Sequence, residues 1–169
     1  MKQKNTRLYN LFFPVWLLFA HPLLIGAALP VNLLIDFLVI FLTLKYLHVE
    51  NRTEIVTAKI WRTWGLGFAA DAIGAAILFF LSVILPEIAP ATDDTFGSAL
   101  YLNPFRSLPA TLIMLAVIAL VGILIYWFNY SYVFENTTLT KREQKRVCLA
   151  LAILTAPYLF LLPTAWFVI

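Results

Sequence analysis

The amino-acid sequence predicts an all-α integral membrane protein, a single helical bundle over residues 1–169 with five transmembrane helices. The chain is 62% hydrophobic and only 12% charged, which is about half the charged share of an ordinary water-soluble domain. Its apolar runs are also long enough for about five crossings, because a hydrocarbon core of about 30 Å needs about 20 residues per helix. An ordinary soluble domain is therefore excluded.

The first two predicted helices, 8–29 and 31–47, form a hairpin. Basic residues precede the first apolar run, as in a signal-anchor helix, and a cleaved signal peptide is the alternative. Pro30 suits the first position of the second helix, where its missing N–H has no helical partner to lose. We therefore expect a tight turn at Pro30.

The third predicted helix, 63–85, is an apolar run with a carboxylate inside it. Before it, Asn51 followed by Glu54 is typical of a capping box, so the helix is expected to begin near Thr53 as a cytoplasmic extension. The connection that follows, 86–109, is rich in proline and acidic residues. We expect this connection to be an irregular extracytoplasmic loop that folds back onto the membrane surface.

The last two predicted helices are 110–130 and 147–169. Thr140 and Glu143 have the spacing of a capping box and predict a helical extension before the fifth crossing. Two prolines should bend the fifth helix, as membrane helices tolerate. An alternative with four crossings places the last helix partly in the membrane interface.

The distribution of basic residues predicts the orientation. With five crossings, eleven of the twelve Lys and Arg residues fall on one side, and Arg106 falls on the other. Cytoplasmic segments carry the excess of Lys and Arg. The N-terminus is therefore expected in the cytoplasm and the C-terminus outside, with the chain in the cell membrane.

Two predicted helices carry small or polar residues at helical spacing, and each set shares one face. Lipid tails offer such residues nothing, so both faces should turn toward other helices. The helix-packing face of the third helix consists of Gly67, Asp71, Gly74 and Ser82, and the second polar stripe consists of Asn32, Asp36 and Thr43.

Three ionisable side chains, His21, Asp36 and Asp71, lie inside apolar runs. Such residues are candidates for a proton or cation path; the alternative is that protonated carboxyls hydrogen-bond across helices. The hairpin would place Asp36 near the outer surface, within reach of His21. Asp71 is then expected nearly two turns from Asp36, with Tyr126 or Thr155 as neighbours.

Enzyme and cofactor motifs are missing from the sequence. We find no metal-ligand or phosphate-binding motif and no catalytic triad signature, and the single Cys148 excludes an internal disulfide. The sequence therefore predicts no catalytic residue, no metal and no cofactor, and nucleic-acid binding is not expected.

Our first hypothesis is a non-enzymatic membrane protein that acts by self-association or as an accessory subunit of a membrane complex. Its partners would be the lipid bilayer and either a second copy or another membrane protein. The alternative is a proton- or cation-coupled transporter or channel, and a lipid-modifying enzyme comes third.

Overall fold

The computed structural model describes residues 22–84 and 94–163, and every regular element in these ranges is helical. The elements are α-helices with short π-helical and 3-10 segments. In order they are α1 (Pro22–Tyr46), α2 (Arg52–Phe79), η2 (Phe80–Ile84), α4 (Asp94–Leu102), η3 (Pro104–Arg106), α5 (Leu108–Phe128), η4 (Asn129–Val133), α6 (Lys141–Leu154) and η5 (Tyr158–Leu161).

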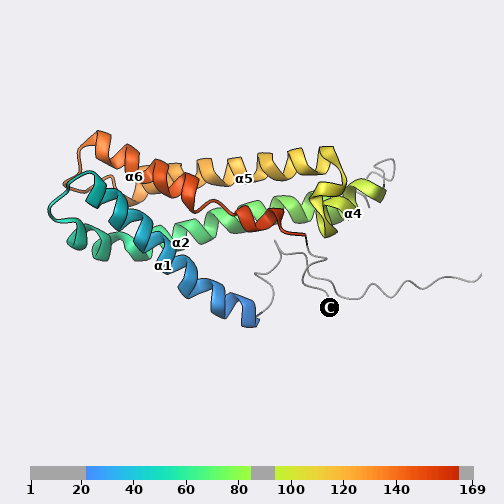
Figure 1. The fold of residues 1–169 in the computed structure, drawn as a ribbon, viewed down its shortest axis with the longest axis horizontal. Helices are drawn as coiled ribbons and strands as arrows, with labels where there is room; N and C mark the ends of the chain where they lie inside the picture. Colours follow the sequence, from blue (N-terminus) through green and yellow to red (C-terminus); the bar gives the residue numbers. More distant parts are fainter. Residues whose placement is uncertain (1–21, 85–93, 164–169) are drawn as a thin grey trace, which may run out of the picture.

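Four long helices form a bundle in which α1 packs against α2 and α6, and α5 packs against the same two helices (Figure 1). Within the described ranges, four segments are long and apolar enough to cross a membrane: Leu29–Tyr46, Arg52–Ile84, Leu108–Val133 and Lys141–Leu161. The predicted all-helical fold is therefore confirmed for the described residues, and the length and composition of four helices fit the predicted membrane location. The predicted count of five crossings is not, since the described residues provide four.

The predicted hairpin at Pro30 is wrong. Helix α1 runs without a break from Pro22 to Tyr46 and contains Pro30 in its interior. Proline removes one helical hydrogen bond, but membrane helices tolerate this loss. The indole of Trp64 on α2 donates a hydrogen bond of 3.1 Å to the carbonyl of Leu29, the residue before the proline. Residues 8–21 of the first predicted helix lie outside the described ranges.

Helix α2 begins at Arg52, within one residue of the predicted start, but the predicted capping box does not form. Asn51 makes no side-chain cap. Its amide instead donates to the Thr138 hydroxyl, at 3.2 Å, in the connection between η4 and α6. A long-range contact has therefore displaced the local one.

The expected irregular loop over 86–109 contains helical structure. Helix α4 and the 3-10 turn η3 lie within it, and α4 packs against η2 and α5. Burial of Ala99 and Leu100 explains why this short segment is helical. Residues 86–93 lie outside the described ranges.

The capping box at the start of α6 is confirmed. The Thr140 hydroxyl accepts from the Glu143 backbone N–H, while the Glu143 carboxylate accepts from the Thr140 backbone N–H at 2.8 Å. The predicted extent of 147–169 is wrong, because α6 ends at Leu154 and a 3-10 turn follows Pro157. A proline cannot continue the backbone hydrogen bonding, and here the chain bends away. Residues 164–169 lie outside the described ranges.

Candidate carboxylate site

Two carboxylates lie inside the bundle. Asp36 on α1 is 7% exposed and Asp71 on α2 is 8% exposed. Both helices are otherwise apolar at this level, so the side chains are held among hydrocarbon groups. Their positions follow from helix packing, since α1 and α2 are direct neighbours.

Asp36 lies against α2 at Gly67. A Cβ atom added at Gly67 would lie 3.9 Å from the Asp36 Oδ2 atom. Asp71 follows Gly67 by one helical turn, about 6 Å along α2. The two carboxylates therefore lie on neighbouring helices, with Asp71 about one turn beyond the residue of α2 that Asp36 approaches.

The position of Asp36 along its helix differs from the predicted one. The prediction placed Asp36 near an outer turn at Pro30, but α1 continues two turns past that residue, so Asp36 lies near the middle of its helix. Asp36 lies nine residues before Lys45, and Asp71 lies nine residues after Arg62. Each acid is thus about 13 Å along its helix from a basic residue that lies toward the same end of the bundle.

The charges of the two carboxylates are not balanced by the described residues around them. No cation of the described residues interacts with Asp36 or Asp71. The Asp71 Oδ1 atom is buried and has no hydrogen-bond partner in the described part of the chain, and the same holds for the Thr63 hydroxyl two turns earlier on α2. A buried carboxylate without a partner is costly, so a proton or a bound cation would lower its free energy.

The other predicted neighbours are engaged elsewhere. The Thr155 hydroxyl donates to the Leu151 carbonyl at 2.8 Å, and the Tyr126 ring stacks on Tyr130 with 5.8 Å between centroids. His21, the third predicted member of the path, lies outside the described residues. The hairpin that would have carried His21 toward Asp36 is not present.

The remaining members of the predicted packing face of α2 lie against the chain itself. A Cβ atom at Gly74 would lie 2.5 Å from Val121 Cγ2 on α5 and 3.1 Å from a ring carbon of Phe160 in η5. Ser82 is buried, and its hydroxyl donates to the Leu78 carbonyl at 2.7 Å. This face therefore closes the interior of one chain.

The second polar stripe is less buried. Asn32 and Thr43 are half-buried, in contrast to Asp36 between them. Thr43 lines a groove between α1 and α6, into which Arg146 also projects. The residues of the stripe therefore face different neighbours. Asp36 lies toward α2, whereas Thr43 lies in the groove between α1 and α6.

Two buried polar residues near the start of α6 were not predicted as site residues. Gln144 donates from Nε2 to the Tyr130 carbonyl at 2.8 Å, and Asn129 donates from Nδ2 to the Ile125 carbonyl at 2.9 Å. Both are fully or almost fully buried. Asn129 carried a signal in the sequence, since it is an amide at the end of an apolar run.

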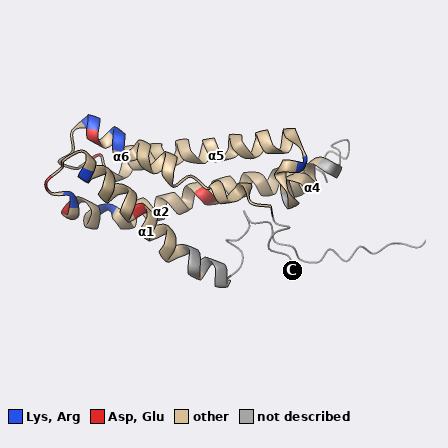
Figure 2. Ribbon diagram, in the orientation of Figure 1, with Lys and Arg blue, Asp and Glu red and all other residues tan. Residues whose placement is uncertain are grey.

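The charged residues of the described ranges are strongly segregated. Apart from Arg106 in η3, all Lys and Arg residues lie at the end of the bundle where α1 leads into α2 and where α6 begins (Figure 2). We call this the basic end. The carboxylate pair lies away from it, within the apolar length of the helices.

The arrangement suits a proton or a monovalent cation better than a divalent metal. In the described ranges, no group of three or more His, Cys, Asp or Glu side chains could hold a metal ion. Two carboxylates alone fall short of the six to eight oxygen ligands that Ca²⁺ takes. No protein-family model, curated protein or solved structure matches this chain.

Proposed function

We propose that this chain is a small multi-pass membrane protein that conducts protons or monovalent cations through its bundle, with Asp36 and Asp71 as the carriers. The supporting observation is the placement of two buried, uncompensated acids on neighbouring apolar helices, with Asp36 lying against α2 at Gly67. Ionisable residues at membrane depth are costly, and they commonly mark ion pathways.

The pair supplies the chemistry of a relay. Two like charges in a low-dielectric interior repel, so one proton or one cation shared between them relieves the repulsion. A second proton arriving at one carboxyl would release the first from the other. Rotation of a carboxyl side chain covers part of the gap between neighbouring helical turns, and water molecules would carry the proton over the rest.

The proposed orientation follows the basic end. Placing that end in the cytoplasm satisfies the positive-inside rule, because Arg106 is the one basic residue of the described ranges at the other end. In this proposed orientation the described part of the chain begins and ends on the extracytoplasmic side, and the location of the C-terminus outside stays a prediction. The test is a reporter protein that is active only in the cytoplasm, fused after Ile169. Activity of this fusion would contradict the proposed orientation.

The test is ion flux in liposomes that contain the purified protein and a pH-sensitive dye. An imposed potassium diffusion potential should drive proton entry, and Asp71→Asn and Asp36→Asn should each reduce entry to that of protein-free liposomes. Glu135→Gln is the matched control, because Glu135 is an exposed acid at the basic end. Its flux should equal that of the unmodified protein.

Two results would reject the proposal. One is flux that survives both aspartate substitutions in protein of unchanged helical content. The other is an absence of flux under proton, sodium and potassium gradients alike, measured with the matching indicator for each ion.

A second candidate function is association with another membrane protein, as an accessory subunit. The supporting observation is the first half of α1, which leaves the bundle and lies apart from α5 and α6 (Figure 1). Its side chains Val31 and Leu34 are apolar and exposed. Native mass spectrometry of the protein extracted from its own membrane would show a stoichiometric partner in this case, and a chain without protein partners would oppose it.

A further inference from the structure

We propose that the groove between α1 and α6 at the basic end binds an anionic phospholipid, with the phosphate at Arg146 and an acyl chain along the apolar walls. This site is separate from the carboxylate pair, and it does not depend on the proposed ion conduction. The groove has a volume of about 440 Å³ and is lined by Leu42, Thr43, Tyr46, Leu47, Arg146 and Ala150.

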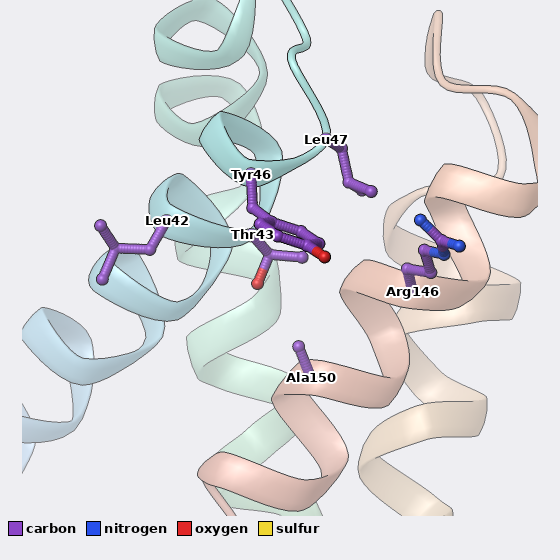
Figure 3. A pocket seen from close by; sticks show the side chains of 6 residues that line it. All are labelled: Leu42, Thr43, Tyr46, Leu47, Arg146 and Ala150. Carbon is purple, nitrogen blue, oxygen red and sulfur yellow. The ribbon is translucent and has the colours of Figure 1, made fainter.

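The groove is lined from two helices with unlike chemistry. Figure 3 shows the Tyr46 ring reaching from α1 toward α6, with Arg146 rising from α6 on the other side. The Thr43 and Tyr46 hydroxyls and the Arg146 guanidinium are its hydrogen-bonding groups. A phosphate diester needs donors of this kind, and a guanidinium offers two parallel N–H groups to its oxygens.

The groove is polar at one end and apolar at the other, as a lipid molecule is. Tyr46 is the last residue of α1, so the polar end of the groove lies at the basic end of the bundle. One turn away from that end, Leu42 and Ala150 form apolar walls. Beyond them, Leu38 and Ile153 are exposed apolar side chains. An acyl chain could therefore follow the helices while its headgroup stays at their charged end.

The charge around the groove favours an anionic occupant over a zwitterionic one. Lys45 directly precedes Tyr46, and Arg142 and Lys145 lie within one turn of Arg146 on α6. All three are exposed. The nearest acid on α6, Glu143, is held by Thr140 in the capping box. Basic pockets between helices at the cytoplasmic side bind anionic lipid headgroups, at about 1 kcal/mol per basic residue near the surface.

The groove is too open to hold a small free ligand, since Tyr46 is 77% exposed. A lipid does not need enclosure, because the bilayer covers the remaining surface of its acyl chains. This difference selects the membrane lipid over a soluble phosphate compound that has the same headgroup chemistry.

The test is native mass spectrometry of the full chain in mixed micelles with equal amounts of dioleoylphosphatidylglycerol and dioleoylphosphatidylcholine. The unmodified protein should carry mainly phosphatidylglycerol adducts. Arg146→Gln should lower the ratio of the two adducts about fivefold, the change expected for one basic contact. Arg106→Gln is the control, because it removes one exposed charge at the opposite end of the bundle, from a residue that does not line the groove.

Ala150→Leu is a second variant that keeps the charge and fills the apolar wall. It should reduce adducts of both lipids, so the proposal stays testable if Arg146→Gln fails to fold. Asp71→Asn should leave lipid binding unchanged, which separates this site from the carboxylate pair.

Four outcomes would overturn the proposal: equal loss with Arg106→Gln, no preference for phosphatidylglycerol, full adducts in Ala150→Leu, or displacement of the lipid by millimolar inorganic phosphate. A dimer that dissociates on Arg146→Gln would assign the groove to a second copy of the chain instead.

Discussion

Gly74→Ala should destabilise the bundle strongly, although alanine is the better helix former. The added methyl carbon would lie 2.5 Å from Val121 Cγ2 and 3.1 Å from Phe160. Carbon atoms pack at about 3.5–4.0 Å, so α2 and α5 would have to separate by about 1 Å or more. Overpacking of this kind costs about 1–3 kcal/mol, and the contact with Val121 places Gly74 at the upper end of that range.

Gly65→Ala is the matched control on the same helix. A Cβ atom at Gly65 meets nothing within 4 Å, so this variant keeps the propensity gain of about 1 kcal/mol without the clash. The two variants should therefore differ by about 3 kcal/mol in unfolding free energy. For a chain of this size, the difference corresponds to about 6–12 °C in melting temperature.

The assay is thermal unfolding in detergent micelles, followed by circular dichroism. Val121→Ala should restore part of the stability of Gly74→Ala, because it removes the methyl groups that the new side chain strikes. Equal melting temperatures for Gly74→Ala and Gly65→Ala would refute the reasoning and the close α2–α5 contact with it. A loss of stability that appeared only at high protein concentration would place the small-residue face in contact with a second copy.

Three further predictions concern the helix ends and α1. Thr140→Ala removes the side-chain cap of α6 and should lower the unfolding free energy by about 1 kcal/mol, which is measured as faster hydrogen exchange in the first turn of α6. Glu143→Gln should lower it less, because the amide oxygen of glutamine still accepts the hydrogen bond. Gln144→Leu leaves the buried Tyr130 carbonyl without its donor and should cost about 1–3 kcal/mol in thermal unfolding; an unchanged melting temperature would contradict this hydrogen bond. Pro30→Ala should raise both helical content and stability if α1 is continuous, and a loss of stability would favour the turn that the sequence predicted.

The elements that sequence reasoning located well are those decided by local chemistry. The Thr140–Glu143 cap begins α6 as predicted, because both partners lie within one turn. The run 110–130 matches most of α5, since its side chains are apolar on every side and nothing in it interrupts a helix.

The failures came where a distant contact competes with a local preference. Pro30 and Asn51 have side chains that favour a turn and a cap, respectively. Packing of α1 against α2 and α6 keeps the proline inside a helix, and the Asn51 side chain donates from Nδ2 to the Thr138 hydroxyl and makes no cap. Helix α4 was missed because its apolar residues gain from burial against α5 and η2, which its own sequence does not reveal.

The same distinction between local and long-range determinants applies to the carboxylate site. The sequence alone determined that Asp36 and Asp71 lie in apolar helices and that small residues accompany Asp71, because composition and helical periodicity are properties of a single segment. Their relative position depends on how the two helices pack, and it follows from the length of α1 and from the approach of Asp36 to Gly67 on α2. Neither can be read from one helix, so only the tertiary structure decided that the acids are neighbours.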